Sequence, residues 1–232
     1  MSLQYMRAVA VVSSFNEESV IADTVSALQA LEGVERVVVV DDASSDSSSV
    51  RAADAGAEVV VNGSNLGKGG SLNRVLAGLR FEALLLIDGD LGAHAAEAGK
   101  VLEPVLEGDC DLAIAAFPPP AKKGGFGVTQ GLARGGIKAL SGLEMRSPIS
   151  GQRAMTRAVF DSVFPFREGF GVEVAMTLDA HRAGFRIVEV PTVMSHSETG
   201  RDFAGFVHRG RQFADIARAL ASRALRRGVM GR

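Results

Sequence analysis

The chain has 232 residues, enough for one domain with a sizeable core or for one domain with an appendage. Its formal net charge of −2 gives no global reason to expect binding to nucleic acid. No stretch approaches the roughly 20 uninterrupted apolar residues that span a bilayer. The single cysteine, Cys110, cannot form an internal disulfide, which fits a reducing compartment. We therefore expect a cytoplasmic protein that is not integral to a membrane.

The first ninety residues alternate between short apolar runs and amphipathic segments. The apolar runs predict four buried strands, at residues 8–12, 36–40, 58–61 and 84–87. Helices are expected between them, the first capped by Asn16 and closed by Gly33, and the others at residues 50–55 and 72–79. This alternation predicts an α/β fold with a mostly parallel, doubly wound sheet and helices on both faces. Ligands bind such sheets beyond the carboxyl ends of the strands.

Acidic residues gather at these predicted carboxyl ends, namely Glu17, Asp41, Asp42, Asp88 and Asp90. Asp88 and Asp90 flank Gly89 directly after the fourth strand, so their carboxylates can converge if the glycine turns the chain. Two convergent carboxylates suit Mg²⁺ or Mn²⁺, and that ion would neutralise a diphosphate. Taken alone, the stretch is equally compatible with a polar turn after a core strand.

A glycine-rich loop covers residues 62–71 and leads into the third predicted helix. It does not match the nucleotide-triphosphate cradle, because Gly63 and Gly67 are three residues apart and Gly69 follows Lys68. The dinucleotide fingerprint is also missing after the first strand. Backbone amides at the helix start, together with Lys68, can hold an anion, and a plain turn remains the alternative.

The second half predicts further helices at residues 95–106 and 128–140, one that ends at Arg182, and strands at residues 112–116 and 185–190. Residues 118–127, with Lys122 and Lys123, form either a mobile lid or an exposed connection. The tail is a basic amphipathic helix that either lies on an anionic membrane or packs on the domain or on a second copy of the chain.

Four segments, in this order, closely resemble family 2 glycosyltransferases of the GT-A fold: Phe15-Asn16-Glu17-Glu18, Asp41-Asp42 with Ser44 and Asp46, Asn65-Leu66-Gly67-Lys68-Gly69, and Asp88-Gly89-Asp90. The resemblance extends to polyprenyl-phosphate sugar synthases and glucosyl-3-phosphoglycerate synthases. It implies a GT-A domain at residues 1–200, with a nucleotide-sugar-binding half at 7–116 and an acceptor half at 117–200. The basic helix then occupies residues 201–232.

The resemblance also implies roles for individual residues. In the first half, the nucleotide would be held by Asn16, Glu18, Asp42 and Lys68, and the metal–diphosphate by Asp88 and Asp90, with Asp90 also counted as catalytic.

In the second half, Gly151-Gln152-Arg153 is similar to the acceptor-side and donor-sugar segment of the family. Glu173, in Gly171-Val172-Glu173, resembles the acidic motif of the two synthase groups and is the candidate base. His196 matches a histidine that completes the metal site in some relatives, and a surface histidine is the alternative.

We therefore expect metal-dependent transfer of a sugar from a nucleotide-diphosphate sugar, with UDP-sugar as the expected donor. The acceptor would be a small molecule or a polyprenyl phosphate. Two alternatives remain open at this point. One is a phosphatase with an aspartyl nucleophile, whose motif usually lies on the first strand. The other is a sugar-nucleotide-binding protein without turnover.

Overall fold

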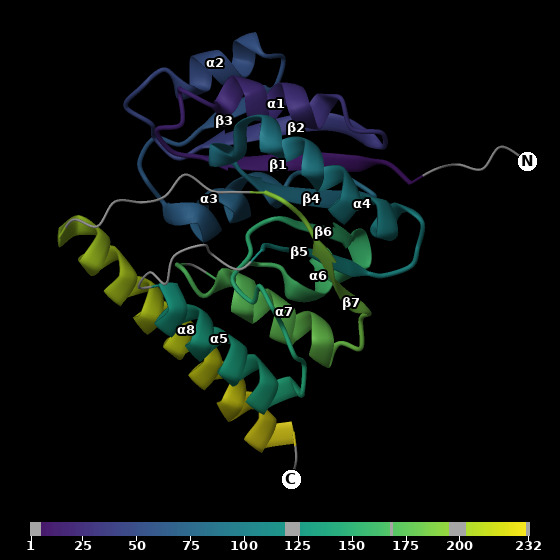
Figure 1. Ribbon diagram of the computed structural model, residues 1–232, viewed down its shortest axis with the longest axis vertical. Helices are drawn as coiled ribbons and strands as arrows, with labels where there is room; N and C mark the ends of the chain where they lie inside the picture. Colours follow the sequence, from purple (N-terminus) through teal and green to yellow (C-terminus); the bar gives the residue numbers. More distant parts are fainter. Residues whose placement is uncertain (1–5, 119–125, 168, 195–202, 231–232) are drawn as a thin grey trace, which may run out of the picture.

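The structure is a computed structural model that describes residues 6–118, 126–167, 169–194 and 203–230. Within these residues, seven strands form one sheet in the order β3-β2-β1-β4-β6-β5-β7 (Figure 1). The strands are β1 (Ala8–Ser14), β2 (Val34–Asp41), β3 (Glu58–Val61), β4 (Ala83–Asp88), β5 (Leu112–Ala116), β6 (Arg153–Thr156) and β7 (Ile187–Pro191). Only β6 runs antiparallel to its neighbours, so the predicted mostly parallel sheet is confirmed.

Helices cover both faces of this sheet. They are α1 (Ile21–Gln29), α2 (Ser48–Asp54), α3 (Gly67–Leu76), α4 (Ala98–Leu106), α5 (Phe126–Ser141), α6 (Arg157–Val163), α7 (Val172–Arg182) and α8 (Phe203–Met230), with a 3-10 segment η1 (Gly89–Glu97) after β4. Alternate residues of β1 enter two separate cores. Val9 and Val11 join the core under α3, α5, α6, α7 and α8, while Ala10 and Val12 join the core under α1, α2 and α4.

The first helix begins later than predicted. Asn16 does not cap it, because its φ of 57° is left-handed and its side-chain oxygen accepts a hydrogen bond from the Ser45 amide at 2.8 Å. The helix therefore starts at Ile21, after a turn in which the amides of Val20 and Ile21 bond to the carbonyl of Glu17.

The third helix begins five residues earlier than predicted, at Gly67 rather than Leu72. The carboxylate of Asp42 accepts hydrogen bonds from the amides of Leu66 and Gly67, both at 2.8 Å. A carboxylate at this place satisfies two amides that have no partner inside the helix and complements the helix dipole. The glycine-rich run is helical for this reason.

The sequence did not reveal β6 and α6. The strand has only four residues and begins with a charged arginine, so neither alternation nor an apolar run marks it. The helix carries one local signal, because the Thr156 hydroxyl oxygen accepts a hydrogen bond from the Val159 amide at 3.4 Å as an N-cap.

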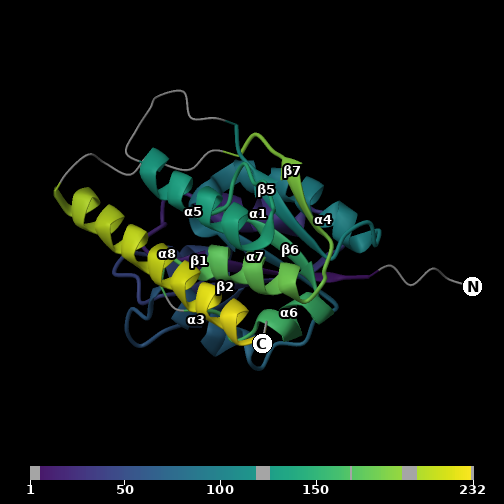
Figure 2. The ribbon, with the colours of Figure 1, turned by 90° about the horizontal axis from the view of Figure 1, so that it is seen from below.

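The long helix α8 packs along α5 and α7 (Figure 2). Its buried side chains are Ile216, Ala219 and Leu220, and Gly136 of α5 leaves room for Leu220. Of the alternatives left open for the tail, packing on the domain is therefore found for residues 212–225, whose side chains the structure describes. Among the described helices, none has both the length and the apolar character needed to cross a membrane.

Candidate active site

The carboxyl ends of β1, β2 and β4 meet at one edge of the sheet, where a pocket of about 250 Å³ opens. Its lining comes from the ends of these strands and from the start of α3, namely Ser13, Ser14, Phe15, Glu17, Val40, Asp42, Lys68, Ser71, Asp88, Gly89 and Asp90. The sequence predicted that the acids at the strand ends would lie together, and four of them line this pocket. Asp41 instead lies buried and accepts hydrogen bonds from the amide and hydroxyl of Ser44.

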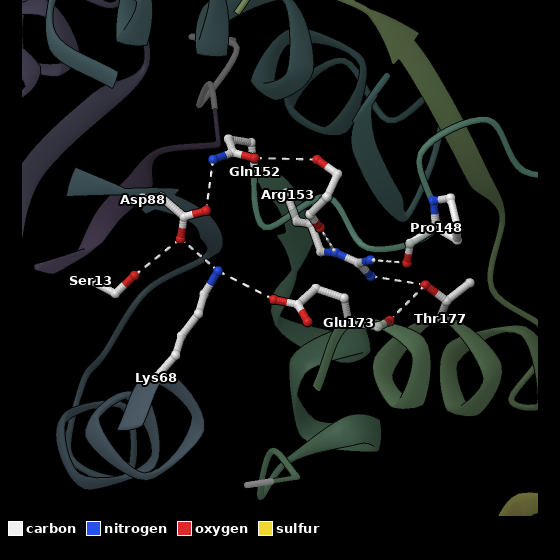
Figure 3. Close-up of polar contacts among 9 residues, drawn as sticks. Ser13, Lys68, Asp88, Pro148, Gln152, Arg153, Glu173 and Thr177 are labelled. Carbon is white, nitrogen blue, oxygen red and sulfur yellow. Dashed lines mark hydrogen bonds and ion pairs between the residues drawn. The ribbon is translucent and has the colours of Figure 1, made fainter. Parts of the chain in front are cut away.

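Asp88 and Glu173 approach each other through a shared lysine. The ammonium nitrogen of Lys68 lies 2.6 Å from Oδ1 of Asp88 and 3.3 Å from Oε1 of Glu173 (Figure 3). Burial would lower the pKa of Lys68, but the two carboxylates outweigh burial and keep this pKa above its usual value. The candidate donor-side aspartate and the candidate base therefore lie on either side of one positive charge.

Two further side chains fix the carboxylate of Asp88. The Ser13 hydroxyl donates to Oδ1 at 3.2 Å, and the Gln152 amide donates to Oδ2 at 2.9 Å. Gly151 is also pressed against this group, because a Cβ at that position would lie only 2.5 Å from Oδ2 of Asp88 and closer still to Lys68. The predicted segment from Gly151 to Gln152 thus lies beside Asp88, opposite the start of α3.

Arg153 occupies a different place from its two neighbours. Its side chain is fully buried and donates hydrogen bonds to the Ser150 carbonyl at 2.8 Å, the Thr177 hydroxyl at 2.9 Å and the Pro148 carbonyl at 3.4 Å (Figure 3). Burial lowers the pKa of this guanidinium to about 10, and the negative charge of Glu173 partly offsets the effect. The guanidinium therefore supports the loop before β6 and the first turns of α7, away from the pocket surface.

Asp42 is engaged with the loop that carries Lys68. Besides the amides at the start of α3, its Oδ1 accepts from the Ser71 hydroxyl at 2.6 Å and from the Asn62 amide at 2.9 Å. Burial raises the pKa of Asp42, but these donors outweigh burial and hold the pKa below its usual value. The charged carboxylate thus fixes α3, and with it Lys68, against β2.

Asn16 and Glu18 tie together the loops that follow β1 and β2. Oε2 of Glu18 accepts from the Ser47 amide at 3.0 Å, and the Glu18 amide donates to Asp46 at 3.2 Å. Both predicted nucleotide-binding residues therefore connect the two loops beside the pocket. Neither of them lines the pocket itself, although their neighbours Phe15 and Glu17 do.

Glu17 lines the pocket but was not among the predicted site residues. Burial, and after it the charge of Asp90 and two other aspartates, raise the pKa of Glu17 to about 7. The available signal was its position at the carboxyl end of the first strand, shared with the other clustered acids. The family resemblance instead assigned nucleotide binding to the neighbouring Glu18.

The donor set at this edge fits a hard divalent cation. Burial is the main cause of the raised pKa of Glu17, and the charges of Asp90, Asp46 and Asp88 add to it, so a cation at this edge would offset part of the shift. Asp88 and Asp90 offer the carboxylate oxygens that Mg²⁺ and Mn²⁺ prefer. His196, the third predicted ligand, lies outside the described residues. Within the described part of the chain, no three His, Cys, Asp or Glu side chains gather into a metal cluster of their own.

Comparison with known proteins places this site in a family. The sequence profile of "Glycosyl transferase family 2" matches residues 9–164. The chain is 31% identical over 193 residues to glycosyltransferase AglJ of Haloferax volcanii, a match that covers 82% of this chain and 63% of that protein. It is 32% identical over 194 residues to glucosyl-3-phosphoglycerate synthase of Mycolicibacterium smegmatis, covering 74% and 63%. The chain thus spans just under two thirds of the length of these relatives.

A solved structure agrees with the sequence matches. The crystal structure of glucosyl-3-phosphoglycerate synthase from Mycobacterium tuberculosis in complex with Mn²⁺, UDP and glucosyl-3-phosphoglycerate aligns with a TM-score of 0.80 at 27% identity. The alignment covers 94% of this chain and 80% of that chain. The family profile extends over more than half of the chain, from β1 to the end of α6. The chain belongs to glycosyl transferase family 2 and has the GT-A fold.

Proposed function

We propose that the protein transfers a sugar from a nucleotide-diphosphate sugar, with a UDP-sugar as donor, to a phosphate-bearing acceptor in a metal-dependent reaction. The observation that carries the proposal is the arrangement of Asp88, Lys68 and Glu173 across one pocket at the carboxyl edge of the sheet. The relatives named above support the same reaction class.

On the donor side, the leaving diphosphate develops negative charge as the bond from sugar to phosphate breaks. Lys68 offers an ammonium group held on the rigid start of α3, so this charge is met without a large rearrangement. Asp88 and Asp90 would hold Mg²⁺ or Mn²⁺, which supplies Lewis-acid stabilisation of the diphosphate when bound. Asp42 contributes by fixing the loop that carries Lys68.

On the acceptor side, Glu173 is the candidate base. It lies in the first turn of α7, is only 9% exposed, and contacts Lys68. A hydroxyl acceptor needs a group that removes its proton, and our proposal assigns this role to Glu173. A phosphate oxygen acts as the nucleophile without such a base. The effect of Glu173→Gln therefore separates the two kinds of acceptor.

The first test measures thermal stability with a panel of nucleotide diphosphates, with and without Mn²⁺. A ligand at about 100 times its dissociation constant adds about 2.7 kcal/mol of stability. We expect stabilisation by UDP that needs the metal and disappears in Asp90→Ala. Asp54→Ala, at an exposed position at the end of α2, is the matched control and keeps the effect. Folded protein without a shift for any nucleotide would refute the donor site.

The second test identifies the acceptor. UDP release from UDP-glucose is measured with 3-phosphoglycerate and, separately, with a polyprenyl phosphate in detergent. The Mycobacterium tuberculosis complex contains a glucosylated phosphoglycerate, which supports the first acceptor. If the polyprenyl phosphate is the better acceptor, we also propose that the arginine-rich tail contacts an anionic membrane. A homodimer formed through the tail is a separate prediction.

A further inference from the structure

The C-terminal helix α8 contacts the loop that precedes Glu173. Oδ2 of Asp215, in the middle of this helix, accepts a hydrogen bond from the backbone amide of Phe170 at 3.1 Å. Glu173 follows Phe170 by three residues and is the second residue of α7. A residue about 40 positions further along the chain therefore holds the backbone just before the candidate base.

Two glycines make this contact possible. Gly169 has a φ of +76°, and a Cβ at this residue would collide with the Asp215 carboxylate. A Cβ on Gly171 would lie 2.8 Å from both the Asp215 carbonyl oxygen and the Cβ of Ala219. The loop backbone thus touches the backbone of α8, and the Gly-Phe-Gly sequence before α7 has a packing reason. The proposed reaction itself does not require glycine at these positions.

The rest of α8 is anchored firmly enough to act as a support. Arg223 forms an ion pair with Asp179 near the end of α7, and Arg182 donates to the Arg223 carbonyl at 2.8 Å. The other oxygen of the Asp215 carboxylate, Oδ1, lies 2.8 Å from Nη1 of Arg218 in an exposed ion pair. The helix therefore holds α7 at both ends, and Asp215 is its contact at the end where Glu173 lies.

We propose that Asp215 is a positioning residue for Glu173. The inference rests on the proposed function, in which Glu173 acts on the acceptor. Glu173 reaches Lys68 at 3.3 Å from the first turn of α7, so a displacement of the start of this helix changes that distance directly. The tail then serves the reaction through the face that packs on the domain.

The test is a double-mutant cycle on the whole 232-residue chain, using UDP-glucose and 3-phosphoglycerate. Asp215→Ala is expected to lower kcat by about 10- to 100-fold, because small misplacements of a reacting group have effects of this size. The KM for UDP-glucose and the metal-dependent binding of UDP stay unchanged. In a Glu173→Gln background, Asp215→Ala causes no further loss, since it acts only through Glu173. An equal loss in both backgrounds overturns the inference.

Three further variants define the contact. Arg218→Ala removes the ion pair but leaves the bond to Phe170, and it keeps kcat within about twofold of wild type. Asp215→Asn keeps an oxygen acceptor and restores most of the activity lost in Asp215→Ala. Gly171→Ala leaves Asp215 intact but forces the loop from α8, and it lowers kcat as Asp215→Ala does. Full activity in a folded Gly171→Ala protein would contradict the inference.

Amide hydrogen exchange provides a readout that needs no substrate. Residues 169–173 are expected to exchange faster in Asp215→Ala than in wild type, and unchanged in Arg218→Ala. Unaltered exchange of this loop in Asp215→Ala overturns the inference whatever the activity. Absence of transfer by the wild-type protein would refute the proposed function, while the exchange experiment still decides whether Asp215 holds the loop.

Discussion

The ammonium group of Lys68 lies 2.6 Å from the carboxylate of Asp88, the residue that the Asp-Gly-Asp motif assigns to the metal–diphosphate. One positive charge thus already sits at the place where the proposed divalent cation would bind. Both side chains are about three-quarters buried, so water screens their attraction less than at the open surface. Lys68 and a metal ion must therefore share or compete for the same oxygens.

The first prediction concerns Lys68→Met. Loss of the ammonium leaves Asp88 and Glu173 without their common partner, so the free energy of unfolding should fall by about 1.5–3 kcal/mol in metal-free buffer. Millimolar Mn²⁺ should stabilise this variant more than wild type, because the metal no longer competes with an ammonium group. Urea unfolding with and without Mn²⁺ measures both effects.

The matched control for this prediction is Lys100→Met, which removes a lysine paired with Glu97 at 2.9 Å on the surface. Its cost should stay below about 1 kcal/mol and should not respond to Mn²⁺. If Mn²⁺ stabilises Lys68→Met less than wild type, Lys68 and the metal do not share Asp88.

The fold was largely predictable because buried parallel strands appear in the sequence as continuous apolar runs. The runs at Val9–Val12 and Leu84–Ile87 are apolar throughout, and each ends in a polar residue where the sheet meets solvent. In contrast, β6 is held mainly by its neighbours β4 and β5 and begins with Arg153. Tertiary pairing of this kind cannot be recognised from four residues.

The site was predictable only in part, for a similar reason. Strand ends identify which acids gather, and hence Asp88 and Asp90. They do not show which polar atoms those acids bind. Asp42 accepts hydrogen bonds from amides at the start of α3, and the Arg153 guanidinium donates to Thr177. In both cases the partners are more than twenty residues apart in the sequence. The family resemblance placed both Asp42 and Arg153 among the substrate-binding residues, and that role stays a prediction.

The second prediction is that Gly151→Ala damages the site. The added methyl group would overlap the Asp88 carboxylate and the Lys68 ammonium, so one of the two must move. We expect a cost of about 1–3 kcal/mol in unfolding free energy and loss of the metal-dependent stabilisation by UDP. Gly131→Ala on α5 is the control, because its Cβ would meet no atom within 4 Å. That variant should gain about 0.5–1 kcal/mol in stability.

The third prediction concerns the buried Arg153. Arg153→Met keeps the volume but leaves the Ser150 carbonyl and the Thr177 hydroxyl without their donor. Buried groups that lose a partner cost about 1–3 kcal/mol each, so the loss of two partners should lower the unfolding free energy by about 2–6 kcal/mol. Arg153→Lys should recover only part of this, because an ammonium group cannot reproduce the planar fork of the guanidinium. Denaturant unfolding measures the free energies of wild type, Arg153→Lys and Arg153→Met, which should decrease in that order. An unchanged unfolding free energy in Arg153→Met would show that these hydrogen bonds add no net stability.

The fourth prediction concerns the pH dependence of stability and depends on Glu17. Burial and the neighbouring aspartates raise the pKa of Glu17 to about 7 in the folded protein, from a value of 4.5. Between these pH values the unfolded chain has lost this proton and the folded chain retains it. The folded state therefore binds more protons, and stability must fall as the pH rises through this window.

Glu17→Gln removes this ionisation, so stability between pH 4.5 and 7 should fall less steeply than in wild type, and the variant should be the more stable protein at pH 8. Glu32→Gln, at an exposed position outside the pocket, should retain the slope of wild type. Chemical unfolding of the metal-free proteins at half-unit pH steps measures the slopes. Equal slopes for wild type and Glu17→Gln would mean that Glu17 ionises as freely in the fold as in the unfolded chain.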